Sequence, residues 1–277
     1  MPAFTFACRL INSEFSTWPA TLRRLIKPYW QKTLTDDENG LISGVSMALG
    51  EALGLTESAG KSAAASLLLW TAANLQDDVL DEDNAPRSNG LLSEACLISA
   101  ARIIGRHFFS GRYLRLLLES SAANADELEH VPPANEVSAC GKSVFLIAPL
   151  LYLASGRISA EEINRLESAL RFSLAAKQLA DDVYDYQEDW LKGKRSLAHE
   201  GLSSLPTTAE LPAYFHRYAR RILNLCSKSR KIIKKIPMLS DRDILSPLIA
   251  TVEANCQKCL ASLSLPDPIG HTETRTH

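Results

Sequence analysis

The sequence predicts an all-α protein, and three features support this prediction. Alternation of β-branched and polar residues is scarce, whereas segments rich in alanine, leucine, serine and glutamate with helical spacing occur along nearly the whole chain. Hydrophobic residues make up 46% of the sequence and only 13 residues are glycine, as in a compact globular protein. No segment with the composition of a domain linker interrupts the chain. We therefore expect a single-domain helical bundle over residues 1–265 and a disordered tail over residues 266–277.

Turn residues and caps divide this helical pattern into about eight helices. The predicted helices cover about residues 17–34, 41–53, 57–83, 92–120, 136–154, 159–185, 213–236 and 241–263. Pro19 would lie in the first turn of the first helix. Gly54 follows the second helix as its C-terminal glycine, and Pro86 stops the third.

The boundaries in the second half depend on similar signals. Residues 124–135 contain two consecutive prolines and are expected to form a connection. Pro149 is expected to kink the fifth helix. Ser159 and Glu162 have the spacing of a capping box, which predicts that the sixth helix starts there.

One aspartate-rich pattern occurs twice, each time at the end of an apolar run. The two copies are Leu75–Asp81 (LQDDVLD) and Leu179–Asp185 (LADDVYD). Each has aspartates at positions i, i+1 and i+4, so a helical period places the first and the last on one face. Carboxylates this close raise each other's pKa unless a cation neutralises them. Acidic residues near helix ends are usually just solvated, but the repetition favours two Mg²⁺ sites that together hold a diphosphate.

Composition argues against several other classes of function. Acidic and basic residues nearly balance, at 32 and 30, so no nucleic-acid partner is expected. The longest apolar segments, 62–75 and 144–154, are shorter than the ~20 residues that span a bilayer, so no transmembrane segment is expected. The N-terminal segment lacks the basic start and long apolar core of a secretory signal.

The cysteines favour a reducing compartment. All six are scattered, without the density of a disulfide framework, which predicts a cytoplasmic protein. Cys256 and Cys259 form a CxxC pair, but neither a second pair nor suitably spaced histidines accompany it, so a zinc site is not predicted.

The two motifs resemble those of the class I isoprenoid synthases, which include trans-prenyltransferases, squalene and phytoene synthases, and class I terpene synthases. Asp77–Asp81 (DDVLD) resembles the first DDxxD motif. Gln178–Asp185 (QLADDVYD), followed by Gly193 and Lys194, resembles the second motif, QxxDDxxD followed by GK. Cys140–Ser143 (CGKS) occupies the place of the Lys-Thr pair of the prenyltransferases.

A second frame of the same region resembles squalene and phytoene synthases. Asp185–Asp189 (DYQED), followed by Gly193 and Lys194, is similar to their DxxED and Gly-Arg pair. The sequence is thus a hybrid of the two patterns, and the resemblance covers about residues 67–194.

The resemblance implies a bundle of the isoprenoid synthase type with a central active-site cavity, about three Mg²⁺ ions and a prenyl diphosphate substrate. The implied catalytic aspartates are Asp77, Asp78, Asp81, Asp181, Asp182 and Asp185. The implied metal ligands are Asp77, Asp81, Asp181, Asp185 and Asp189. The implied diphosphate-binding residues are Arg87, Lys142, Gln178 and Lys194. Candidates for an aromatic lining that stabilises a carbocation are Trp70, Phe145, Tyr152, Phe172 and Tyr184.

Departures from the prenyltransferase pattern favour a reaction of one prenyl diphosphate over chain elongation with a second one. Chain-elongating relatives bind a second diphosphate through Gly-Gly-Lys-x-x-Arg, whereas the counterpart here, Asn39–Gly44 (NGLISG), has no basic residue. Ser88 follows Arg87 where a second arginine is usual, and residues 67–76 contain no histidine. We therefore expect a terpene synthase that cyclises, or eliminates a proton from, one prenyl diphosphate. Chain elongation, head-to-head condensation or transfer to an acceptor without a diphosphate are the alternatives.

Two hypotheses that assign the protein to other classes of function stay open. The chain could be a non-catalytic subunit that pairs with an active synthase, although intact aspartate motifs argue against this. The basic helix over residues 217–235 could bind a membrane surface or a polyanion, although a solvated outer face is the simpler account. Dimerisation is typical of the prenyltransferases, so a homodimer is a further expectation from the resemblance.

Overall fold

The computed structural model describes residues 2–37, 40–81, 86–105, 111–129, 131–194 and 196–262 of the chain. Within these residues the regular structure is helical, with an isolated bridge between Ser155 and Ile158 and no strand. The all-α prediction is therefore confirmed. The predicted tail over 266–277 lies outside the described residues.

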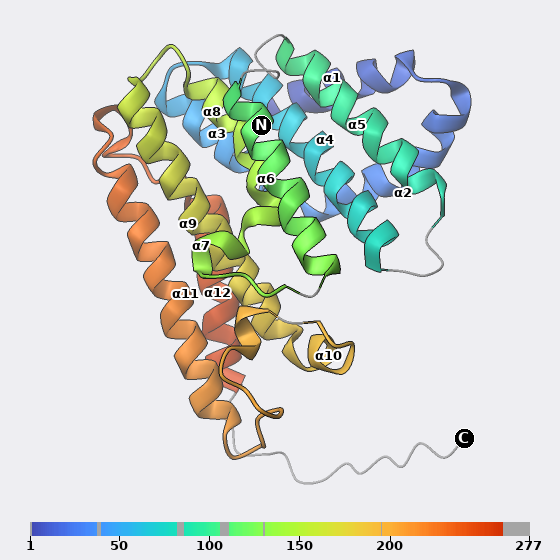
Figure 1. Cartoon of the computed structure of the whole chain (residues 1–277). Helices are drawn as coiled ribbons and strands as arrows, with labels where there is room; N and C mark the ends of the chain where they lie inside the picture. The colour runs from blue at the N-terminus through green and yellow to red at the C-terminus, as the bar shows by residue number, and fades with distance from the viewer. Residues whose placement is uncertain are drawn as a thin grey trace.

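Helices of very different lengths make up the fold (Figure 1). The α-helices are α1 (Pro2–Thr17), α2 (Ala20–Asp36), α3 (Ser43–Ala52), α4 (Thr56–Asp81), α5 (Ser88–Ile104), α6 (Gly111–Leu128), α7 (Glu136–Ala139), α8 (Ala148–Ala154), α9 (Ala160–Tyr184), α10 (Tyr186–Leu191), α11 (Leu211–Ile233) and α12 (Ser246–Ser262). The 3₁₀ helices are η2 (Gly141–Ile147), η3 (Leu197–His199) and η4 (Pro237–Leu239).

Helix α4 lies in the core and carries the first aspartate motif at its end. Consecutive residues of its middle, including Leu67, Leu68 and Leu69, are fully buried, as expected for a helix with neighbours on every side. Its neighbours are α1, α3, α5 and α8. The approach to α3 is close, because a Cβ atom added to Gly50 would lie 2.2 Å from the Cβ of Ala59.

The second motif belongs to a group formed by α9, α11 and α12. Small hydroxyl residues join α9 to α11, where Ser173 Oγ lies 2.8 Å from Ser229 Oγ and the Ser229 hydroxyl donates to the carbonyl of Ala169 at 2.6 Å. Both serines are buried, so their hydrogen bonds satisfy polar groups that water does not reach.

A charged network bridges α6 and α9. The Arg171 guanidinium donates to both oxygens of Glu119, at 2.5 and 2.7 Å, and its Nε donates to Glu167 Oε1 at 3.1 Å. Arg115 Nη2 donates to the same Glu167 oxygen at 2.6 Å. These contacts hold α6 alongside α9.

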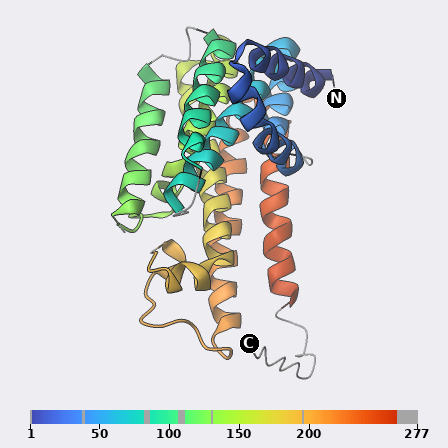
Figure 2. The same ribbon diagram turned by 90° about the vertical axis from the view of Figure 1, so that its right-hand side faces the viewer.

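Helices α4, α6 and α9 run in the same direction. In both views their C-terminal ends point down, toward the end of the molecule where α10 lies (Figures 1 and 2). Both aspartate motifs lie at C-terminal ends of this set, on α4 and on α9.

Several predicted boundaries are confirmed. Helix α4 begins one residue before the predicted start at 57, whereas the predicted end at 83 lies outside the described residues. Gly54 follows α3 with φ +67°, and a Schellman motif closes the helix, since the amide of Leu55 donates to the carbonyl of Gly50 at 2.7 Å. The capping box of Ser159 and Glu162 starts α9 as predicted.

Other predictions were wrong for local reasons. The first predicted helix is preceded by α1, which buries Ala7 and Ile11 at helical spacing. The single helix over 92–120 is two helices, because Gly105 leaves the helical conformation with φ +74°. The helix over 136–154 is divided into α7, η2 and α8, and Pro149 lies in the first turn of α8, where a proline needs no kink.

No helix among the described residues combines the length and the apolar composition needed to cross a membrane. Five of the cysteines are described as free thiols, and all except Cys8 are buried. The side chain of Cys259, the second member of the CxxC pair, lies outside the described ones.

Candidate functional site

The second aspartate motif borders a cavity of about 400 Å³, named here the acidic cavity. Its wall comes from the end of α6, the connection to α7, the start of η2, the end of α9, α10 and the turn that follows α10. The sequence-predicted residues that line it are Lys142, Gln178, Asp181, Asp182, Asp185, Asp189 and Lys194. Seven residues from two separate segments of the chain, around residue 142 and over residues 178–194, therefore line one cavity.

The polar contacts of these side chains are specific. Asp181 Oδ2 accepts from Lys177 Nζ at 2.5 Å, and Asp182 Oδ1 accepts from Gln178 Nε2 at 2.8 Å. Lys142 Nζ lies 2.5 Å from Glu127 Oε2. The amide of Asp185 donates to the carbonyl of Asp181 at 2.9 Å, so the two residues are one helical turn apart.

The carboxylates of the acidic cavity interact unfavourably with one another. Burial raises the pKa of Asp182 to about 7, and the charge of Asp189 acts in the same direction. The pKa of Asp185 is raised by burial and then by the charges of Asp189 and Asp181. The pKa of Asp189 is raised as well, chiefly by burial. A cation bound among these groups would relieve this cost.

The sequence analysis missed three contributors to this site. Asp126 and Glu127 line the acidic cavity from the last turn of α6, a helix that the prediction ended at residue 120. Lys177 was also missed, although its i, i+4 spacing to Asp181 on a predicted helix could have indicated the ion pair.

The first aspartate motif stands apart from the lining of the acidic cavity. Asp77 is exposed, and Asp78 is half-buried and accepts from Asn89 Nδ2 at 3.4 Å. Arg87 is exposed at the start of α5. The side chain of Asp81 lies outside the described ones. None of the described side chains of this motif, nor Arg87, lines the acidic cavity.

Acidic residues lie at the C-terminal ends of three helices, where a negative charge lowers helix stability. The C-terminal end of a helix carries partial negative charge, so cations are favoured there and anions are not. The last turns of α4, α6 and α9 contain no basic residue, yet each carries aspartate or glutamate near its end. Because the three ends point toward the same side of the molecule (Figure 2), the arrangement attracts cations.

A second cavity lies between α3, α4, η2, α8, α9 and α12 and is named here the central cavity. Its volume is about 50 Å³, and its wall is mostly leucine, isoleucine and valine. Trp70 and Ser66 of α4 also line it, and neither Trp70 Nε1 nor Ser66 Oγ has a hydrogen-bond partner in the described part of the chain. Lys177 reaches it from α9.

The aromatic candidates have different surroundings. Trp70 lines the central cavity, whereas Tyr184 is 80% exposed. Phe145 is buried in the core, and Phe172 lies under the ammonium group of Lys228 at 5.7 Å from the ring centroid. Tyr152 lines a third pocket.

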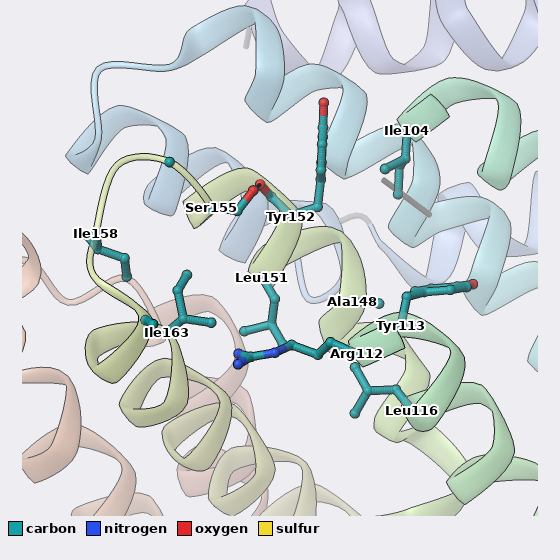
Figure 3. A pocket seen from close by; sticks show the side chains of 12 residues that line it. Ile104, Arg112, Tyr113, Leu116, Ala148, Leu151, Tyr152, Ser155, Ile158 and Ile163 are labelled. Carbon is teal, nitrogen blue, oxygen red and sulfur yellow. Dashed lines mark hydrogen bonds between the residues drawn. The ribbon is translucent and has the colours of Figure 1, made fainter. Parts of the chain in front are cut away.

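This third pocket, of about 430 Å³, lies near the N-terminal ends of α6 and α9 (Figure 3). Arg112 extends across it from α6 toward Ile163, among mainly apolar side chains. Its guanidinium donates to Asn164 Oδ1 at 2.8 Å and pairs with Glu167. The pocket contains no residue of either aspartate motif.

The donor set of the acidic cavity fits Mg²⁺. Among the described residues, no group of three or more His, Cys, Asp or Glu side chains is arranged to hold a metal ion. Mg²⁺, however, commonly takes only one or two protein carboxylates and completes its octahedron with water and phosphate oxygens. Asp181 and Asp185 are the carboxylates best placed to supply such a partial set.

The basic segment over 217–235 lies on α11 and the two turn residues that follow it. Arg221 pairs with Glu136 at 3.0 Å and Glu200 at 2.7 Å, and Arg230 pairs with Glu253. Part of the basic charge is thus neutralised within the chain, which weakens the case for a polyanion-binding surface.

Comparison with known proteins found no match to a protein-family model and no match among curated proteins.

Proposed function

We propose that this protein is a Mg²⁺-dependent enzyme that ionises an allylic prenyl diphosphate, in the manner of the class I isoprenoid synthases. The observation that carries the proposal is the acidic cavity, which gathers the second motif, Lys142 and Lys194 around one space. The resemblance of both motifs to that superfamily supplies the reaction class.

Charge explains why such a cavity would take a diphosphate only together with cations. Its described lining has six carboxyl groups, on residues 126, 127, 181, 182, 185 and 189, and two lysines, an excess of four acidic groups. A bare diphosphate would be repelled. Divalent cations would first be attracted by the carboxylates and would then supply the positive charge that binds the diphosphate.

The residues then have distinct tasks. Lys142 and Lys194 would bind diphosphate oxygens by charge-assisted hydrogen bonds. Gln178 holds Asp182 in position. Bound Mg²⁺ would stabilise the negative charge that develops on the leaving group. The bond between the allylic carbon and oxygen breaks, the electron pair leaves with the diphosphate, and an allylic cation remains.

The cation would have to react away from water. The apolar wall of the central cavity, with Trp70 in it, lies along the same helices α4 and α9 that carry the two motifs. Apolar walls exclude water, and an aromatic face stabilises a cation. We infer that the cation cyclises or loses a proton there, which is the terpene synthase reaction.

The proposal of a single substrate depends on the differences between this sequence and the chain-elongating prenyltransferases. Asn39, in the segment that would replace Gly-Gly-Lys-x-x-Arg, lies outside the described residues. The remaining described part of that segment, residues 40–44, supplies no basic side chain. The described residues of this segment therefore offer no basic side chain to bind a second, homoallylic diphosphate.

The test is incubation of the purified protein with Mg²⁺ and prenyl diphosphates of ten, fifteen or twenty carbons, each with and without isopentenyl diphosphate. Released diphosphate and extracted products are measured. A cyclic or eliminated hydrocarbon, or an alcohol, from one substrate alone is the expected result. A longer prenyl diphosphate made only with the second substrate would replace the terpene synthase proposal with chain elongation.

Two variants connect the reaction to the motifs. Asp77→Ala and Asp181→Ala should each abolish diphosphate release while the metal-free protein keeps its helicity and melting temperature. Lys142→Ala should weaken substrate binding more than folding. Full activity of either aspartate variant, or absence of release from every substrate with the wild-type protein, would contradict the proposal.

A further inference from the structure

One ion pair joins a residue that lines the acidic cavity to a residue that lines the central cavity. Asp181 lines the acidic cavity, whereas Lys177, one turn earlier on α9, lines the central cavity. Their charged groups are joined, with Lys177 Nζ 2.5 Å from Asp181 Oδ2. A molecule with its diphosphate in the first cavity and its apolar chain in the second would have to pass this pair.

Lys177 also connects the helices of the two motifs. Its ammonium lies 5.4 Å from the centroid of the Trp70 ring, a distance typical of a cation–π contact. Trp70 belongs to α4 and Lys177 to α9, so the lysine bridges the two helices at the wall of the central cavity.

In this arrangement the central cavity is too small for a prenyl chain. Its volume of about 50 Å³ is far below the ~300–1,000 Å³ of typical small-molecule pockets. A chain of ten or more carbons needs several times this volume. The prenyl chain can enter only if a side chain of the cavity wall moves. Lys177 has a long, flexible side chain, and its ammonium group could instead lie among the carboxylates of the acidic cavity.

We propose that Lys177 is a gate between the two cavities, held closed by Asp181 and opened when a divalent cation binds that carboxylate. The inference rests on the proposed function. Mg²⁺ competes with the lysine for Asp181, and the released ammonium turns from Trp70 toward the acidic cavity, where diphosphate oxygens can accept from it. Departure of the side chain enlarges the central cavity, so cation binding precedes entry of the apolar chain.

The test uses a probe that has the chain but not the diphosphate. Calorimetry measures binding of Mg²⁺ alone, and then binding of a fifteen-carbon prenyl alcohol with and without Mg²⁺. Because a half-exposed ion pair is weak, we expect Mg²⁺ to tighten alcohol binding to the wild-type protein by about threefold to tenfold. The emission of Trp70, assigned by comparison with Trp70→Phe, should change on addition of Mg²⁺ as the ammonium leaves the ring.

Variants separate the gate from simple charge effects. Lys177→Ala and Asp181→Asn remove either side of the pair, and each should bind the alcohol equally with and without Mg²⁺. Lys61→Ala removes the same charge from an i, i+4 ion pair with Glu57 on α4, outside the lining of both cavities, and should keep the Mg²⁺ effect. If Lys177→Ala does not fold, Lys177→Gln replaces it.

The outcomes distinguish this inference from the function on which it rests. Mg²⁺ that binds the wild-type protein without changing alcohol affinity overturns the gate and leaves the proposed function standing. Equal Mg²⁺ effects in the wild-type protein and Lys177→Ala also overturn the gate. Failure of Mg²⁺ to bind at millimolar concentration overturns both.

Discussion

Replacing Asp182 by asparagine should make the protein more stable at alkaline pH. Asp182 is only 7% exposed, and burial raises its pKa from the ordinary 3.8 to about 7. The folded protein therefore binds a proton more tightly than the unfolded chain between these values, so the free energy of unfolding falls as pH rises through this window. Asparagine does not titrate and keeps an oxygen that can accept from Gln178.

The size of the effect follows from the two pKa values. A difference of about three pH units at ~1.4 kcal/mol each gives an upper limit of ~4 kcal/mol. Roughly 2–3 kcal/mol of this falls between pH 5 and pH 8. Urea unfolding followed by circular dichroism at both pH values measures it, and Mg²⁺ at pH 8 should recover more stability in the wild-type protein than in Asp182→Asn.

Asp185→Asn provides the matched control, because Asp185 lines the same cavity but is exposed. Its substitution should change the pH dependence less. If Asp182→Asn and the wild-type protein differ by the same free energy at pH 5 and at pH 8, the carboxyl group of Asp182 titrates normally and our account of the site's electrostatics is wrong.

Three other substitutions test the fold by the same urea unfolding. Gly50→Ala should lower the free energy of unfolding by ~1–3 kcal/mol, because the added Cβ would overlap Ala59. The control Gly90→Ala adds a Cβ into open space and should leave the free energy of unfolding unchanged or raise it by up to ~1 kcal/mol. Equal effects of the two substitutions would refute the close contact between α3 and α4. Glu167→Gln should cost ~2 kcal/mol, because Arg115 and Arg171 lose charge-assisted hydrogen bonds to a buried carboxylate while Arg171 keeps those to Glu119, and a loss below ~0.5 kcal/mol would contradict this. Ser229→Ala should cost ~1 kcal/mol through its lost hydrogen bonds, and no change would show that water replaces them.

Local signals in the sequence predicted the helices that carry the motifs. The apolar run before Asp77 and the capping box at Ser159 set α4 and α9 to within a few residues. Helix α1 was not predicted although Ala7 and Ile11 have helical spacing, because Pro19 is a stronger start signal and marks a later helix. The break at Gly105 was missed because a single glycine inside a helical pattern does not reveal its φ angle.

The site was predicted in part. Helical spacing puts Asp181 and Asp185 on one side of α9, but the meeting of α9 with Lys142 and Glu127 depends on how α6 and η2 cross it, which no local pattern encodes. The size of the central cavity likewise depends on packing among six helical elements. Sequence patterns therefore indicate candidate functional groups more readily than the shape of the cavity that those groups line.

The most direct test of the central claim is a crystal structure of the protein grown with Mn²⁺ in place of Mg²⁺ and with inorganic diphosphate. Anomalous scattering locates the metal without ambiguity. Our account predicts a Mn²⁺ peak at ligand distance from a carboxylate oxygen of Asp181, with diphosphate bridging it to Lys142 or Lys194. An acidic cavity without metal and diphosphate at saturating concentrations of both would contradict it.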